Sequence, residues 1–276
     1  LSTTSYPIDS KANAVILFDI GSARFITETG VGLRLEFIRK TKIKVLTTDG
    51  TDVANRTLTL SINGNRKEEL RKLKAYSYNL VNGSIEKVKM SKDNVQKEHA
   101  HKFEDKIKFA IPNVRAGSII EIEYVISTPF FGGLYPWFFQ SEYPTIYSEY
   151  KIRTPEFLKY RPSIRGFVNI QSPPGEIVSE SIGGISSAST EVIMSASDVP
   201  AFEPEPFISG KLNYMARINF ELYDIAFLGQ ANMVPPLQNW SDYDALILNN
   251  ENLGGFLDDQ KVMSKITKEW PATSSV

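Results

Sequence analysis

The feature that most limits the fold of this 276-residue chain is the alternation of apolar and charged residues along its first 230 positions. Between Leu33 and Thr47, apolar side chains share one face and charged ones the other (Leu33, Leu35, Phe37, Ile43 and Val45 against Arg34, Glu36, Lys40, Lys42 and Lys44). This period of two is typical of a strand with one buried face. Arg39 falls in the apolar series, and a β-bulge is the commonest reason for such a break; a sheet edge or a buried ion pair are the alternatives.

The same pattern recurs in residues 70–90 and 107–126. Asp49-Gly50 and Asn82-Gly83 predict hairpin turns, because both dipeptides tolerate the positive φ that two-residue turns need. A short apolar run in residues 13–22 is expected to end at Gly21. Shorter strands are predicted in residues 160–171, 175–184, 189–197 and 215–224, with a proline-containing connector at 198–207.

The last part of the chain has helical spacing instead. One apolar stripe contains Trp240, Tyr243 and Ile247, and a second contains Val262, Met263, Ile266 and Trp270. We therefore predict an all-β fold, a large antiparallel two-lobed β-sandwich with short C-terminal helices. The expected parts are an N-terminal β-sandwich lobe (1–155), a second β lobe packed on it (156–235) and a helical connector to a downstream domain (236–276).

Composition excludes several kinds of chemistry. The chain has no cysteine, so it is no thiol enzyme, and its two histidines, His99 and His101, stand close together in a charged stretch. Two histidines are too few ligands for a structural zinc site, so a charged hairpin tip is the preferred interpretation. We predict no catalytic residue, no metal and no cofactor, although an enzyme that uses carboxylates alone stays an alternative.

Charge and hydropathy limit the partners. Lys and Arg number 31 against 32 Asp and Glu, and this balance argues against a nucleic-acid-binding surface. No apolar run approaches the roughly 18 residues of a membrane span, so no transmembrane segment is expected.

The densest aromatic segment lies at residues 130–150. Buried aromatic side chains commonly form the seam between two sheets, and this interpretation is preferred. The alternative is a ligand-binding platform for an envelope glycan or a peptide. Its candidate residues are Trp137, Phe138, Tyr143 and Tyr147.

Two segments, NVRAGSIIEIEYVISTP (113–129) and PWFFQSEYPTIYSEYKIRTPEF (136–157), resemble a bacterial family of unknown function that precedes transglutaminase-like domains. DSKANAVILFDIG (9–21), SDVPAFEPEPF (197–207) and MARINFEL (215–222) support the resemblance, which covers nearly all of residues 8–270. The resemblance implies a mostly β module exported to the periplasm or cell envelope. It also implies that a papain-like core follows, and none of that core's Cys, His and Asp residues can be placed on this sequence.

Three functions remain open at this point. The leading one is a non-catalytic accessory module that docks or orients a transglutaminase-like or protease-like domain of the same polypeptide. The second is a glycan- or peptide-binding module that uses the aromatic segment. The third is the carboxylate enzyme, for which two convergent carboxylates in a deep cleft would be needed.

Overall fold

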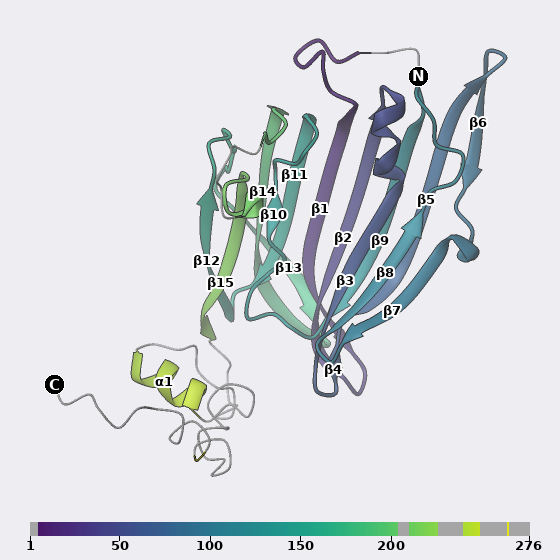
Figure 1. Cartoon of the computed structure of the whole chain (residues 1–276). Helices are drawn as coiled ribbons and strands as arrows, with labels where there is room; N and C mark the ends of the chain where they lie inside the picture. The colour runs from purple at the N-terminus through teal and green to yellow at the C-terminus, as the bar shows by residue number, and fades with distance from the viewer. Residues whose placement is uncertain (1–4, 204–209, 226–239, 249–263, 265–276) are drawn as a thin grey trace. The chain divides into compact units, whose positions relative to one another are not determined.

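The computed structural model describes residues 5–203, 210–225, 240–248 and 264 of the chain. Its internal contacts divide the chain into two compact units, residues 1–222 and 223–276. The described residues are mostly strands, with short 3-10 turns and the helix α1 (Trp240–Leu248), so the predicted all-β class is confirmed (Figure 1).

The larger layer is an eight-stranded sheet of order β13-β14-β11-β1-β2-β9-β5-β6 (Figure 1). Its strands are β1 (Ala14–Glu28), β2 (Gly32–Val45), β5 (Glu69–Val81), β6 (Ser84–Lys89), β9 (Ile119–Thr128), β11 (Thr145–Pro155), β13 (Glu176–Ile182) and β14 (Ile185–Val199). Because β2 and β9 alternate apolar and polar residues, they turn one face to the core, where Leu35, Phe37, Ile120 and Ile122 are buried.

Two smaller sheets provide the second layer. The four-stranded one has the order β4-β3-β8-β7, and the three-stranded one the order β10-β15-β12. Their strands are β3 (Asn55–Asn63), β4 (Arg66–Lys67), β7 (Val95–His101), β8 (Glu104–Ala110), β10 (Trp137–Phe138), β12 (Leu158–Arg165) and β15 (Arg217–Ile225). In Figure 1, β3, β8 and β7 lie in front of one part of the large sheet, and β12 and β15 in front of another. The core fills the space between these layers.

Of the two predicted hairpin turns, one is confirmed and one is wrong. Asn82 and Gly83 join β5 to β6 with φ angles of 50° and 78°, as a two-residue turn requires. Asp49 and Gly50 lie instead in the 3-10 turn η1 (Thr48–Ala54). Gly50 is needed there for close packing, because a Cβ atom at this position would collide with the backbone carbonyl of Asn13.

The sequence predicted that the first strand ends at Gly21. This prediction is wrong, since β1 continues to Glu28. The glycine is required for a packing reason: a Cβ atom at position 21 would overlap the indole ring of Trp137. Trp137 is 1% exposed and stacks on Tyr150 with ring centroids 5.0 Å apart. Its Nε1 donates a hydrogen bond to Ser148 Oγ at 3.0 Å. The aromatic segment therefore contributes to the seam between the layers, which was the preferred interpretation.

The pairing of β1 with β11 departs from the antiparallel pattern. Strands β1 and β11 run parallel, with Ile16 opposite Thr145 and Arg24 opposite Arg153. Beyond them, β11 pairs with β14, so the large sheet includes strands on both sides of residue 155. The division into lobes at residues 1–155 and 156–235 stays a prediction. A boundary at residue 155 would separate strands that belong to the same sheet.

The helical tail is confirmed in its first part, where α1 carries Trp240 and Tyr243. The second predicted stripe, from Val262 to Trp270, lies outside the described residues apart from Ser264. In the described part of the chain, no helix is long and apolar enough to cross a membrane.

Candidate functional site

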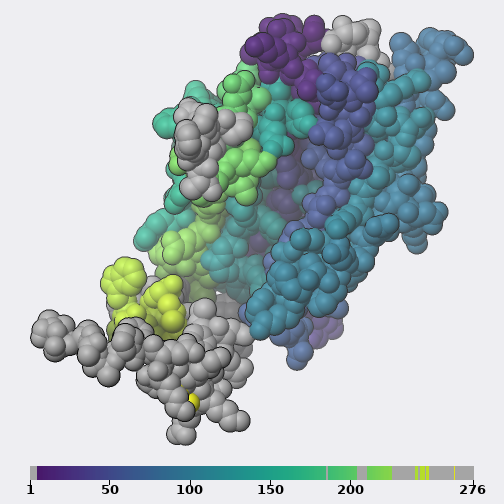
Figure 2. Space-filling model, viewed as in Figure 1, coloured from purple at the N-terminus to yellow at the C-terminus, as the bar shows by residue number. Residues whose placement is uncertain are grey.

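A cleft opens between the two smaller sheets, with the inner face of the large sheet as its floor. Its volume is about 340 Å³. Strands β2 and β9 supply the floor, β3 and β8 one wall, and the segments 138–143 and 211–215 the other. Figure 2 shows this side of the molecule, with the four-stranded sheet in blue and the segment before β15 in green. The lining is mixed: apolar and aromatic side chains alternate with about as many polar ones, which include two arginines, Arg39 and Arg56.

Arg39 lies on the floor because it shares the core-facing parity of Leu35 and Phe37. The pairings of β2 with β1 and β9 both pass through Arg39 without a register shift, so the predicted bulge is wrong. The alternative, a buried ion pair, is what the structure contains. Arg39 donates from Nε to Asp19 Oδ1 at 2.9 Å and from Nη2 to Asp19 Oδ2 at 2.5 Å. Such a fork-to-fork pair is among the strongest polar contacts in proteins.

The carboxylate of Asp19 has a second donor besides Arg39. Thr41 Oγ1 donates a third hydrogen bond to Asp19 Oδ1 at 2.7 Å, and Asp19 is 3% exposed. Burial opposes the charge on Arg39, but Asp19 outweighs it and raises the pKa of Arg39 above its ordinary value. The Arg39 guanidinium also lies over the Trp137 ring, 4.9 Å from its centroid. The Arg39–Asp19 ion pair therefore packs against the aromatic core beneath the cleft.

Arg56 has a different environment. It stands on β3 in the same core-facing series as Leu58 and Leu60. Its Nε is enclosed and has no hydrogen-bond partner, and within the described ranges its guanidinium forms no ion pair. Burial, and then the nearby charge of Arg39, lower the pKa of Arg56. An arginine stays charged in proteins, so Arg56 brings to the cleft a positive charge that no ion pair among the described residues neutralises.

The rim of the cleft contains polar groups that already have partners. Tyr143 OH donates to Asp52 Oδ1 at 3.0 Å, and burial together with this contact raises the pKa of Tyr143 to about 12. Lys211 is paired with Glu142. Among the described residues, neither Asp52 nor Glu142 forms an ion pair with Arg56.

The four aromatic residues proposed from the sequence fall in three places. Phe138 and Tyr143 are half-buried and line the cleft. Trp137 belongs to the core below it, where its ring has no free face for a ligand. Tyr147 lies apart on β11, with its hydroxyl on Glu149. The prediction of a ligand-binding platform therefore now depends on Phe138 and Tyr143, and it stays a prediction.

The two histidines lie away from the cleft, on β7 at the edge of the four-stranded sheet. Both are exposed, and His99 Nδ1 is 2.9 Å from Asp105 Oδ1. In the part of the chain that the structure describes, no three His, Cys, Asp or Glu side chains gather as a metal-binding group. A charged strand edge of this kind is a common protection against edge-to-edge pairing.

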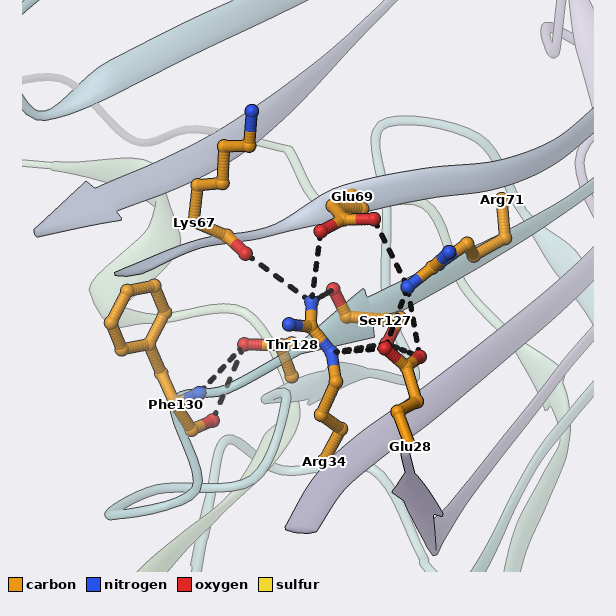
Figure 3. A network of polar contacts seen from close by, with 8 residues as sticks. All are labelled: Glu28, Arg34, Lys67, Glu69, Arg71, Ser127, Thr128 and Phe130. Atoms are coloured by element: carbon orange, nitrogen blue, oxygen red, sulfur yellow. Dashed lines mark hydrogen bonds and ion pairs between the residues drawn. The ribbon is translucent and has the colours of Figure 1, made fainter. Parts of the chain in front are cut away.

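A second enclosed arginine, Arg34, lies on the opposite face of the large sheet near one end of β2 (Figure 3). Its Nε donates to Ser127 Oγ at 2.6 Å, and its Nη2 donates to the carbonyls of Ser127 and Lys67 at 2.8 and 3.2 Å. Glu28 and Glu69 lie within 3.7 and 3.9 Å, and Arg71 connects these two carboxylates. The guanidinium of Arg34 is thus surrounded by acceptors.

Sequence reasoning missed Asp19 and Arg56. For Arg56 a signal existed, because in NRTLTLSIN the arginine takes the place of an apolar residue in the series that continues with Leu58, Leu60 and Ile62. A charge at such a position is either paired or functional. For Asp19 the signal was weaker, since its partner is defined only by the register of β1 against β2.

The fold and this cleft define an all-β module with a charged, partly apolar cavity between its sheets. The chain belongs to the DUF3857 family, a domain of unknown function with a solved structure, whose family model matches residues 34–201. A search among curated proteins found no match.

Among solved structures, a protein described as a "putative protease" from Parabacteroides distasonis has 16% sequence identity and a TM-score of 0.55, and this likeness concerns the fold alone. The match covers 76% of this chain but spans 40% of that chain's length. A "putative nutrient binding protein" from Legionella pneumophila matches with 9% identity over 96% of this chain and 89% of the other, with a TM-score of 0.33. An M1 zinc metallopeptidase from Deinococcus radiodurans matches with 8% identity over 70% and 44%, with a TM-score of 0.29. The last two similarities are too weak to bear on the fold.

Proposed function

We propose that this chain is the non-catalytic β module of a larger exported protein, in which it docks and orients a transglutaminase-like or protease-like domain. The observation that carries the proposal is the unequal coverage in the Parabacteroides protein, where a similar fold makes up 40% of a longer chain. The remainder of that chain has room for a domain of another kind. The exported location and the transglutaminase-like partner rest on the sequence resemblance described above.

The chemistry of the chain supports a non-catalytic role. It has no cysteine, and neither histidine lines the cleft. Nucleophilic catalysis of acyl transfer needs a nucleophile within hydrogen-bond reach of a base, and histidine is the usual base. The described cleft instead combines arginine and tyrosine side chains with apolar walls, which suits binding better than acyl transfer.

The second candidate is an envelope glycan- or peptide-binding module, and one observation favours it. Phe138 and Tyr143, two of the residues proposed from the sequence, line a cavity of about 340 Å³. Cavities of this size with a few placed polar groups are typical of small-ligand sites.

The test of the docking role begins with the reading frame that follows residue 276 in the gene. The whole product, residues 1–276 and the remaining segment would be purified separately, and thermal unfolding and mutual binding would be measured. We expect the two pieces to bind each other, and the partner domain to unfold at lower temperature when it is separated. A reading frame without a further domain, or two pieces that neither bind nor stabilise each other, would contradict the proposal.

Assays with casein, glutamine donors and ester substrates test the non-catalytic role. We expect no turnover by residues 1–276 alone. Robust turnover that is lost when a residue of this chain is changed would overturn that part of the proposal. Calorimetric titration with soluble peptidoglycan fragments tests the second candidate, and binding that weakens in Phe138→Ala would favour it.

A further inference from the structure

Three charged residues stand on core-facing positions of both layers: Asp19 on β1 and Arg39 on β2 of the large sheet, and Arg56 on β3 of the four-stranded sheet. Their charges do not balance. Asp19 accepts three hydrogen bonds from Arg39 and Thr41, and none of the described hydrogen bonds joins it to Arg56, on which its charge acts only from a distance. The interior of the cleft therefore has one more positive charge than negative charge.

The isolation of Arg56 has a physical consequence. An enclosed guanidinium nitrogen without an acceptor loses its hydration and receives nothing in return, and buried polar atoms of this kind are rare in folded proteins. The two rim carboxylates do not relieve it: Asp52 accepts from Tyr143, Glu142 is paired with Lys211, and no described ion pair joins either of them to Arg56. A group that costs stability and has no structural partner is a candidate for ligand recognition.

The side chains that line the cleft indicate the chemistry of the rest of the ligand. The cleft that contains Arg56 has an apolar and aromatic part, made by Leu58, Phe109, Ile122, Tyr124, Phe138 and Met215, beside polar side chains such as Thr57, Gln140 and Ser141. Such walls hold a hydrophobic body. A guanidinium fork matches the geometry of a carboxylate or a phosphate, and the apolar surroundings favour a carboxylate on an organic body over a free inorganic anion.

We propose that this cleft binds a small organic or peptide carboxylate, whose oxygens accept hydrogen bonds from Arg56 while its apolar body lies between the β3–β8 wall and Phe138. The Arg39–Asp19 ion pair stabilises the floor of the cleft and stays paired when the ligand binds. This binding site is independent of the docking role proposed above, because it lies within residues 1–222 and needs no second domain.

The experiment is an NMR or calorimetric titration of the whole chain with N-acetyl-L-phenylalanine. The matched control is its amide, which keeps the apolar body and removes the charge, and inorganic phosphate serves as the anion without an apolar body. We expect the carboxylate to bind at least about tenfold more tightly than the amide, as the loss of one charge-assisted hydrogen bond predicts. Phosphate should bind more weakly than the carboxylate.

Two variants locate the site. Arg56→Gln should remove the difference between the carboxylate and the amide, whereas Arg24→Gln, at an exposed arginine paired with Glu36, should leave it unchanged. Equal binding of carboxylate and amide, a difference that survives in Arg56→Gln, or tighter binding of phosphate would each overturn the proposal. The comparison of carboxylate with amide uses the unmodified chain, so it decides the question even if Arg56→Gln does not fold.

Discussion

Arg34 is buried and Arg56 is half-buried with an enclosed Nε, and the two arginines differ in what surrounds their guanidinium groups. Arg34 reaches a hydroxyl and two backbone carbonyls, and two glutamates lie close by. Arg56 has an enclosed nitrogen with no acceptor among the described residues and a second arginine near it. The first arrangement holds strands together at one end of the large sheet, whereas the second leaves charge available in a cleft. The partners of a charge therefore help to distinguish a structural arginine from a recognition residue.

The largest expected effect is at Trp137, which supports the cleft from below. Trp137→Ala removes a fully buried ring that stacks on Tyr150 and lies beneath the Arg39 guanidinium. We therefore expect a loss of about 3–5 kcal/mol in the free energy of unfolding. Urea unfolding measures it. An unchanged midpoint and slope would mean that the side chain is exposed, and the ligand platform would then include Trp137.

Arg34→Met should cost about 3 kcal/mol, because it leaves Ser127 without its donor and two neighbouring glutamates without this positive charge. The control is Arg24→Met, whose surface pair with Glu36 is expected to contribute no more than about 1 kcal/mol. The midpoint of urea unfolding at equal slope decides between them. If the two variants lose the same stability, the network around Arg34 is not the structural element described here.

Tyr143→Phe tests the rim of the cleft through pH. The pKa of Tyr143 is raised to about 12 by burial and by Asp52, while an unfolded tyrosine has a pKa near 10. Below pH 10 both states keep the proton; between about pH 10 and 12 the unfolded state loses it first, so stability falls through this window. Stability measured at pH 8 and at pH 11 should fall less in Tyr143→Phe than in the unmodified chain. An equal loss in both proteins would show that Tyr143 is not buried at this rim.

The smallest expected effect is at Arg56 itself. Arg56→Met removes an unpaired charge from an apolar wall, so the free energy of unfolding without ligand should stay the same or increase by about 1 kcal/mol. The result is to be compared with Arg34→Met in the same urea series. A loss at Arg56 as large as that at Arg34 would mean that Arg56 has a structural partner, and the contrast between the two regions would disappear.

Much of the fold could be predicted from local pattern. Alternation identified β2, β5, β8 and β9, and Asn82-Gly83 identified one hairpin, because both signals act between residues close in sequence. The parallel pairing of β1 with β11 could not be predicted, since it joins segments more than a hundred residues apart and leaves no local signature. Gly21 and Gly50 were misinterpreted for a related reason: each makes room for a distant group, the Trp137 ring and the Asn13 carbonyl.

The site was predicted only in part. Phe138 and Tyr143 came from aromatic density, which does not separate a cavity wall from the core, and Trp137 was grouped with them for that reason. Arg39 was recognised as an irregular position, but its partner depends on the register between two strands. Arg56 was missed although its strand has the same apolar alternation as β2. Charged residues within an apolar series therefore give a better guide to this site than its aromatic residues do.

The most direct measurement of the central claim is a crystal structure of the chain with bound N-acetyl-L-phenylalanine. We expect a carboxylate oxygen to lie about 3 Å from Arg56 Nε, with the phenyl ring near Phe138 and the Arg39–Asp19 pair intact. A ligand bound elsewhere, or an Arg56 guanidinium that is paired with a carboxylate of the chain itself, would contradict it.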